Sequence, residues 1–233
     1  MWWARPAGAR ELLALLDSGE RGRCARFDRD DDRSRYLAAH ALARLVLAGH
    51  LGIPAPTLAF EATCRQCGAS DHGKPRLGAA GTGVEFSLSH SGARVVLAVA
   101  RDVAVGVDVE RLNRQRDFAA LAPAVLSGAE QLAVAALPDA ERAAAVLRYW
   151  TRKEALLKAT GDGLGVAPTA LTVTPPDAAP ALVAWEAAAP LNVAPHLVDL
   201  SPGPGHVASL AMLGRRLAIV ERDGDELLAT SAG

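Results

Sequence analysis

Residues 105–110 read Val-Gly-Val-Asp-Val-Glu, in which valine alternates with small or acidic residues. Side chains two residues apart along a β-strand point to the same face. The stretch therefore predicts a strand over 104–110 that presents Asp108 and Glu110 together and its valines on the other face. Adjacent carboxylates repel one another unless a proton or a cation lies between them. Without His or Cys nearby they favour Mg²⁺ or Mn²⁺, although a solvated strand end would carry the same residues.

The segments on either side of this strand predict helices followed by antiparallel strands. Upstream, an apolar stripe from Arg33 to His50 indicates a helix, and strand signals cover 57–62, 84–88 and 95–100, with a turn over 89–92. Downstream, helices are expected over 129–136 and 139–159. Further strands are expected over 171–174, 182–186, 196–200, 207–212 and 217–221.

The second half of the chain repeats the order of elements in the first. Arg35-Tyr36 matches Arg148-Tyr149, and Leu51-Gly52-Ile53 matches Leu164-Gly165-Val166 at the same spacing. We infer an internal duplication: an α+β fold of two similar halves, each a long helix packed on an antiparallel sheet, related by a pseudo-twofold axis. The expected halves are residues 1–112 and 113–233. A ligand site is expected at the seam between them.

The composition narrows the class of protein. The net charge of −1 over 233 residues argues against a general nucleic-acid-binding surface. The sequence has no run of 18 apolar residues, so it indicates no membrane span, and the N-terminus lacks the apolar core of a signal peptide. Three cysteines do not make a disulfide framework for a chain of this size. We therefore expect a cytoplasmic protein that meets any polyanionic ligand with a local cluster of charges.

Lysine is scarce, which draws attention to the positions where it occurs. The 25 basic residues include only Lys74, Lys153 and Lys158, and arginine fills the rest. The two residues differ where a site needs a compact charge or a transferable proton, so the lysines are candidates for chemistry. In the helix over 139–159, Glu154 and Lys158 lie one turn apart and could form a surface salt bridge. Alternatively, Glu154 completes a three-carboxylate magnesium site and Lys158 neutralises a phosphate.

Two loops add further candidates. His90 is expected in the turn after Phe86-Ser87-Leu88, where the hydroxyls of Ser89 and Ser91 suit a phosphate. In His72-Gly73-Lys74-Pro75 the glycine allows a close ligand approach and Lys74 could face a phosphate. Cys64 and Cys67 resemble half of a zinc site, which needs four ligands, and whether they bind metal stays open.

In this order and spacing the motifs resemble the signature of the phosphopantetheinyl transferases. They are Gly73-Lys74-Pro75, then the stretch 86–92, then Gly106–Glu110, then Trp150-Thr151-Arg152-Lys153-Glu154 through Lys158. The chain length is similar to the surfactin-synthetase-activator (Sfp) type, which is a monomer with an internal pseudo-dimer. The Cys-x-x-Cys-Gly stretch resembles actinobacterial members.

The resemblance implies a role for each matching position. Asp108, Glu110 and Glu154 would hold magnesium, with manganese as the alternative, against the diphosphate of coenzyme A. The coenzyme A contacts would be Arg44, Gly73, Lys74, Pro75, Ser89, His90, Lys153 and Lys158. Within that set, Arg44 and His90 would take the 3′-phosphate, and the loop over 73–75 would lie along the adenine. The acidic stretch over 28–33 departs from the family pattern, and Arg29 and Arg33 are substitutes for the 3′-phosphate contacts.

The resemblance also implies a reaction. An apo acyl or peptidyl carrier protein would receive 4′-phosphopantetheine on a serine, with Asp108, Glu154 and Lys158 as the catalytic groups and 3′,5′-ADP as the product. Glu154 is the candidate general base. The carrier would dock on the C-terminal half, with Arg114, Arg116 and Phe118 as expected contacts. Two alternatives use the same residues: a magnesium-dependent phosphoesterase, and a coenzyme A-binding module without catalysis.

Overall fold

The computed structural model describes residues 1–62, 68–69, 73–78, 83–113 and 118–231. Within them the helices are α1 (Ser18–Cys24), α2 (Asp30–Leu51), α3 (Ala122–Val125), α4 (Gly128–Ala135), α5 (Asp139–Thr160) and α6 (Asp225–Thr230). The strands are β1 (Trp2–Ala4), β2 (Phe60–Ala62), β3 (Pro75–Leu77), β4 (Val84–Ser91), β5 (Arg94–Arg101), β6 (Val105–Arg111), β7 (Leu171–Val173), β8 (Leu182–Trp185), β9 (Pro195–Leu200), β10 (His206–Leu213) and β11 (Arg222–Asp223). The expected residues Cys64, Cys67, His72, Arg114 and Arg116 lie outside the described residues.

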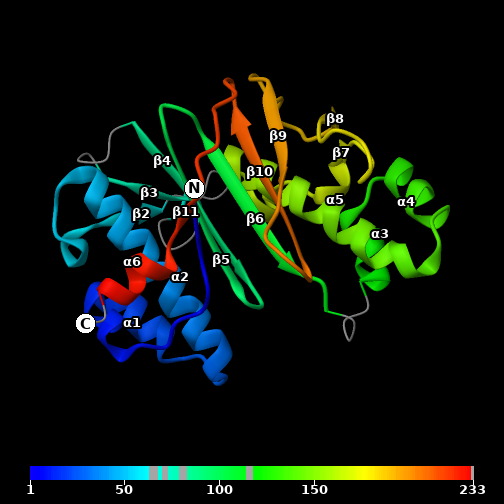
Figure 1. The fold of residues 1–233 in the computed structure, drawn as a ribbon. Coiled ribbons are helices and arrows are strands. Elements are labelled where there is room, and N and C mark those ends of the chain that lie inside the picture. Colours follow the sequence, from blue (N-terminus) through cyan, green and yellow to red (C-terminus); the bar gives the residue numbers. More distant parts are fainter. Residues whose placement is uncertain (63–67, 70–72, 79–82, 114–117, 232–233) are drawn as a thin grey trace.

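Two main sheets lie between the two long helices. One sheet has the strand order β11-β1-β5-β4, and the other has the order β6-β10-β9. In Figure 1, α2 with α1 and α6 covers one side of the strands, and α5 covers the other. The antiparallel pair β2–β3 lies near α2, and the antiparallel pair β7–β8 lies near α5. The α+β architecture is therefore confirmed. Every helix of the described residues is too short or too polar to cross a bilayer.

The two halves repeat both their elements and one buried interaction. Both α2 and α5 have 22 residues, and both β5 and β10 have eight. Ahead of each long helix, a capping-box glutamate turns inward: Glu20 accepts from His40 and Arg44 of α2, and Glu130 accepts from Lys153 of α5. His40 and Lys153 are related by the same spacing as Tyr36 and Tyr149. This recurrence supports the duplication inferred from the sequence.

The chain crosses between the halves twice. Strand β6, at the end of the expected N-terminal half, pairs with β10 of the other half. Near the C-terminus, β11 pairs with β1 in parallel, and α6 packs on α2. The expected division at residue 112 therefore does not separate the two sheets. Strand β6 of the first half joins the sheet of the second half, and β11 of the second half joins the sheet of the first.

Three local predictions were wrong. The turn expected over 89–92 begins later, because β4 continues to Ser91 and the chain reverses at Gly92 with a φ of +55°. The strand expected over 57–62 starts only at Phe60, since a 3₁₀ turn occupies Ala55–Thr57. The strand expected over 217–221 is absent: Leu217 and Ile219 pack on the core between the sheets without joining a ladder.

Strand β6 has the two faces that its alternation predicted. Val105, Val107 and Val109 are buried in the core between the sheets. Gly106 lies on the other face, against α5, where a Cβ atom added to it would be 2.0 Å from the carbonyl oxygen of Ala155 and 2.3 Å from the amide nitrogen of Ala159. No side chain fits between the two backbones, so glycine is what lets α5 approach this strand.

We predict that Gly106→Ala destabilises the protein by about 1–3 kcal/mol, because the methyl group forces α5 away from β6. Urea unfolding followed by circular dichroism measures the change. Gly49→Ala is the matched control: Gly49 is helical, has a negative φ and has no atom within 4 Å of its added Cβ, so its substitution stabilises α2. Equal effects of the two substitutions would contradict the close approach.

Candidate functional site

Serine side chains join β4 to β6. Three alternate serines of β4 accept hydrogen bonds from backbone N–H groups of β6: Ser87 from Val107 (3.0 Å), Ser89 from Val109 (3.3 Å) and Ser91 from Arg111 (3.1 Å). These hydroxyls satisfy the amides of β6 that the neighbouring sheet leaves unpaired, of which those of Val107 and Val109 are buried. We call these three residues the serine ladder. It fixes β6 beside β4 without a backbone ladder between them.

The serine ladder also orients the two acidic residues of β6. The hydroxyl of Ser89 donates to Asp108 Oδ1 at 2.8 Å, and that of Ser91 donates to Glu110 Oε2 at 2.7 Å. Each of these two serines thus accepts from a backbone amide and donates to the neighbouring carboxylate. Alternation in β4 and alternation in β6 bring these groups together, and neither strand would do so alone.

Lys158 reaches the same carboxylate from α5. Its Nζ donates to Asp108 Oδ1 at 2.7 Å, to Ser89 Oγ at 3.1 Å and to the carbonyl oxygen of Val107 at 3.2 Å. The side chain of Asp108 is nearly buried, whereas that of Lys158 is 29% exposed. The ammonium therefore remains accessible to a ligand while it neutralises Asp108.

Glu154 lies one turn before Lys158 on the same helix. Its Oε1 is buried without a hydrogen-bond partner, as is Oδ2 of Asp108. Burial raises the pKa of Glu154 to about 7, opposed by the charge of Lys158 and assisted by those of Asp108 and Glu110. Buried unpaired carboxylate oxygens are unfavourable, so this cluster is built to receive a proton or a cation.

The expected three-carboxylate metal site is not formed by the side chains as they are placed. In the described part of the chain, no three His, Cys, Asp or Glu side chains lie close enough together to hold a metal ion. Asp108 is held by Ser89 and Lys158, and Glu110 by Ser91. The donor set still fits a hard divalent cation, because it is all oxygen and two of its buried oxygens have no partner.

A cavity of about 590 Å³ opens beside this cluster. Its wall combines the loop at 73–75, residues 86–88 of β4, Glu154, Leu157 and Lys158 of α5, and the glycine-rich turn over 161–165. This volume is ordinary for a small-molecule site. The structure thus brings Gly73, Lys74, Pro75, Glu154 and Lys158 together on one cavity at the seam between the halves.

Lys74 lines this cavity but does not present its charge to it. Its Nζ donates to Glu85 Oε2 and to the carbonyl oxygens of Val105 and Ala159, and the side chain is 8% exposed. The expected contact between Lys74 and a phosphate is not available as the ammonium is placed, because the side chain is buried against these acceptors, whereas that of Lys158 is 29% exposed.

Arg44 is likewise not a phosphate ligand, contrary to the sequence-based expectation. Its side chain is fully buried. The guanidinium pairs with Glu20 at 2.6 Å and Asp17 at 2.5 Å and donates to the carbonyl oxygens of Ala55 and Leu58. Arg44 therefore ties α2 to α1 and to the loop that follows α2, and its guanidinium is buried there.

Lys153 makes a comparable buried ion pair in the other half, although the duplication aligns it with His40 and not with Arg44. It is fully buried, and its Nζ donates to Glu130 at 2.5 Å and to the carbonyl oxygens of Val125 and Pro168. Burial lowers the pKa of Lys153, and the bond to Glu130 opposes that shift. The expected coenzyme A contact is thus replaced by a structural ion pair.

Ser89 and His90 face different neighbours. The hydroxyl of Ser89 is committed to Asp108, Lys158 and β6, so the expected phosphate contact does not fit it. His90 is exposed at the end of β4, on the side where α2 contributes His40 and Arg35. Desolvation and the charges of His40, Arg35 and Lys158 lower the pKa of His90. The charges of these neighbours make an electrostatic environment that favours an anion.

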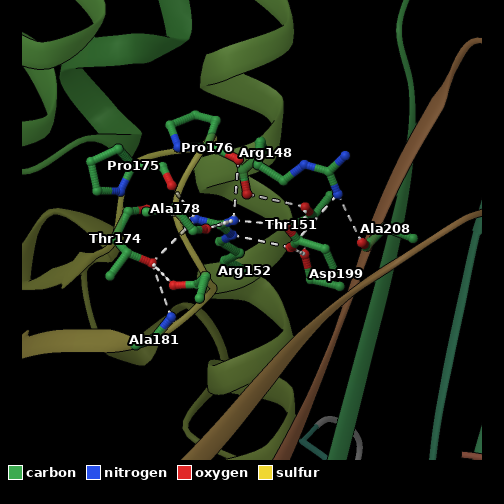
Figure 2. Close-up of polar contacts among 12 residues, drawn as sticks. Arg148, Thr151, Arg152, Thr174, Pro175, Pro176, Ala178, Ala181, Asp199 and Ala208 are labelled. Atoms are coloured by element: carbon green, nitrogen blue, oxygen red, sulfur yellow. Dashed lines mark hydrogen bonds and ion pairs between the residues drawn. The ribbon is translucent and has the colours of Figure 1, made fainter.

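Arg152 anchors the face of α5 that points away from the cavity. Its fully buried guanidinium pairs with Asp199 of β9 at 2.7 Å and donates to the carbonyl oxygens of Thr174, Pro175 and Ala178 (Figure 2). Arg148, one turn earlier, also approaches Asp199 and donates to the carbonyl oxygen of Ala208. This network fixes the face of α5 opposite to the cavity.

Sequence reasoning missed two sets of contributors. The serine ladder was visible as Ser-x-Ser-x-Ser but was interpreted as a phosphate-binding turn. The second is a mostly apolar cavity of about 300 Å³ past Glu110, where Phe118, which the sequence did single out as a carrier contact, lies with Val146, Leu147 and Trp150, among others. Its lining residues come from separate segments, so only the helical spacing of 146, 147 and 150 could have hinted at it.

Comparison with known proteins agrees with this geometry. Residues 104–210 match the family model described as the 4′-phosphopantetheinyl transferase superfamily, and residues 1–102 match the model described as 4′-phosphopantetheinyl transferase, N-terminal. The chain is 34% identical to the 4′-phosphopantetheinyl transferase HetI of Nostoc sp. over 209 residues, which are 88% of this chain and 81% of HetI.

Two further relatives carry similar names. The 4′-phosphopantetheinyl transferase of Bacillus subtilis is 27% identical over 70% of this chain and 69% of its own length. The 4′-phosphopantetheinyl transferase AcpT of Salmonella typhi is 33% identical over 55% of this chain and 59% of its own length. The matches extend over both halves, and the boundary between the two family models falls just before β6.

We predict that the raised pKa of Glu154 makes the protein less stable as the pH rises. The folded state holds this proton more tightly than the unfolded chain does, so the free energy of unfolding falls between about pH 4.5 and about pH 7 and then levels off. In metal-free buffer, the free energy of unfolding of Glu154→Gln should therefore exceed that of the wild type by up to about 3 kcal/mol at about pH 8. Below about pH 4.5 the two free energies should be equal.

Urea unfolding at a series of pH values measures this difference. Glu141→Gln, an exposed glutamate in the first turn of the same helix, is the matched control and should leave the pH profile unchanged. Parallel profiles for the wild type and Glu154→Gln would show that Glu154 does not carry the raised pKa.

Proposed function

The chain belongs to the 4′-phosphopantetheinyl transferase superfamily, and we propose that it transfers 4′-phosphopantetheine from coenzyme A to a serine of an apo acyl or peptidyl carrier protein. The second product is 3′,5′-ADP. The observation that carries the proposal is the group of Asp108, Glu154 and Lys158 beside a cavity of about 590 Å³, with two buried carboxylate oxygens left without partners.

Asp108, Glu110 and Glu154 are the residues that would hold the divalent cation of the reaction, magnesium or manganese. The unpartnered Oδ2 of Asp108 and Oε1 of Glu154 support this assignment. When bound, the cation supplies charge neutralisation for the diphosphate. The hydroxyls of Ser89 and Ser91 each hold one oxygen of Asp108 and Glu110, while Oδ2 of Asp108 has no hydrogen-bond partner.

Coenzyme A would occupy the cavity of about 590 Å³ with its nucleotide along the loop at 73–75. Lys158 is the cation of this chain that we assign to the diphosphate, since its ammonium is partly exposed at the cavity wall. His90 and Arg35 take the place of Arg44 in our assignment of the 3′-phosphate. The support is the positive environment of His90 and the burial of Arg44.

In the transfer step, the carrier serine Oγ forms a bond to the β-phosphorus of coenzyme A. The bond between that phosphorus and the bridging oxygen breaks, and 3′,5′-ADP leaves with the bond electrons. The serine proton goes to Glu154, directly or through a water molecule. A pKa near 7 suits Glu154 to accept a proton at neutral pH. Lys158 stabilises the negative charge on the leaving diphosphate oxygen, and positioning contributes the rest of the acceleration.

The carrier protein would approach from the C-terminal half. The apolar cavity of about 300 Å³ formed by Phe118, Leu147 and Trp150, with Glu110 in its wall, lies next to the carboxylates and suits an apolar contact. We propose that the protein acts as a cytoplasmic monomer of the surfactin-synthetase-activator type, because its internal duplication already supplies both sides of the seam.

The decisive assay mixes the protein with magnesium, coenzyme A and an apo carrier, and follows the intact mass of the carrier. We expect one phosphopantetheine addition per carrier, loss of the addition when the acceptor serine is replaced by alanine, and an equal amount of 3′,5′-ADP. Release of 3′,5′-ADP without a carrier would instead indicate a phosphoesterase. Tight coenzyme A binding with no product would indicate a binding module.

We predict that Glu154→Gln abolishes transfer and leaves coenzyme A affinity close to that of the wild type. The amide keeps the shape of the side chain but accepts no proton, and loss of a general base lowers turnover about 10²–10⁴-fold. Mass spectrometry gives the turnover and calorimetry the affinity, with Glu141→Gln as the control that retains both. Near-normal turnover of Glu154→Gln would remove Glu154 from the base role.

A further inference from the structure

The ammonium of Lys74 connects four segments at the base of the large cavity. It lies in the loop before β3 and donates to Glu85 of β4 at 3.1 Å, to the carbonyl oxygen of Val105 in β6 at 3.1 Å and to that of Ala159 in α5 at 3.2 Å. Its three donors match these three acceptors, and the side chain is only 8% exposed.

Both carbonyl oxygens lie where α5 crosses β6. Val105 directly precedes Gly106, whose missing side chain allows the crossing, and Ala159 belongs to the turn of α5 that packs on Gly106. The carbonyl of Ala159 is one of the last four of α5, which have no partner within the helix. A buried cation there satisfies that oxygen and interacts favourably with the negative end of the helix dipole.

The ammonium of Lys74 is buried, and the carboxylate of Glu85 balances its charge. Burial lowers its pKa, and the carboxylate of Glu85 opposes that shift. Arg76, two residues further along, also pairs with Glu85 at 3.3 Å, but it is half exposed and, among the described residues, makes no hydrogen bond or ion pair to α5 or β6. Lys74 and Arg76 thus both pair with Glu85, but only Lys74 reaches the point where α5 crosses β6.

We propose that Lys74 is a positioning residue, whose ammonium holds the C-terminal end of α5 on β6 so that Glu154 and Lys158 meet Asp108. The proposal rests on the proposed function for its catalytic consequence. Because α5 is one continuous helix, a displacement of Ala159 also moves Lys158, one residue before it, and Glu154, one turn further back. Misplacement of catalytic groups by about 1 Å lowers turnover about 100-fold.

Lys74→Met tests this, because methionine retains the apolar stem and loses the ammonium. We expect kcat to fall about 100-fold. Coenzyme A affinity should stay within about threefold of the wild type, because Nζ touches no ligand. Lys74→Arg should be impaired as well, since a planar guanidinium does not place three donors on acceptors arranged around a single nitrogen. Arg76→Met is the matched control and should keep wild-type kcat and affinity.

The catalytic measurement is made well below the unfolding temperature, with active protein counted by coenzyme A binding stoichiometry. A role in folding alone would lower the unfolding temperature and leave kcat per active molecule unchanged, which would overturn the proposal. A tenfold or larger loss of coenzyme A affinity with unchanged kcat would also overturn it and make Lys74 a phosphate ligand.

Hydrogen exchange separates this proposal from the proposed function, because it needs no turnover. The backbone amides of residues 155–161 should exchange faster in Lys74→Met than in Arg76→Met, whether or not the wild type transfers phosphopantetheine. Equal exchange in the two variants would show that Lys74 does not hold α5. Should Lys74→Met fail to fold, Glu85→Gln keeps both carbonyl contacts and should show the same changes in kcat and exchange at smaller size.

Discussion

The site depends on the close packing of two backbones, where α5 crosses β6 at Gly106. A Cβ atom at this position would lie 2.0 Å from a carbonyl oxygen of the helix. Because the helix lies this near, Lys158 reaches Asp108, two residues further along the strand, and Glu154 lies one turn before Lys158 on the same helix. A bulkier residue at 106 would lift the helix and separate the acidic strand from the basic helix face. The serine ladder acts on the same strand from its other side, so β6 is fixed between β4 and α5.

The three lysines show why this arginine-rich chain retains lysine where it does. Each ammonium has three acceptors: two carbonyl oxygens and Glu85 for Lys74, two carbonyl oxygens and Glu130 for Lys153, and a carbonyl, a serine and Asp108 for Lys158. Three acceptors around a single nitrogen suit a compact ammonium, whereas a guanidinium spreads its five donors in a plane. Arginine occurs where the acceptors are spread, as around Arg152 (Figure 2). The few lysines therefore mark positions where three acceptors surround one nitrogen. Of the three, only Lys158 keeps partial access to the cavity.

The parts of this site that sequence predicts are those set by short-range periodicity. Alternation along β6 places Asp108 and Glu110 on one face, and helical spacing places Glu154 beside Lys158; both hold in the structure. The partners that Arg44, Lys153 and Ser89 have in the structure were not predicted, because those partners come from remote segments. Glu20 and Glu130, which bind the first two, lie more than 20 residues away in sequence. Periodicity gives the direction of a side chain but not the acceptor that it meets.

The duplication explains why this fold has one such cluster instead of two. The halves share the capping-box glutamate, the buried cation on the long helix and the carbonyl after it that this cation binds. The spacing that relates Tyr36 to Tyr149 places Ala41 opposite Glu154 and Leu45 opposite Lys158. Ala41 is fully buried in the apolar core of the first half. The scaffold is thus used twice, but α2 has packing residues where α5 has the two residues that we propose to be catalytic. The first half instead contributes β4 and the loop at 73–75 to the cavity of the second.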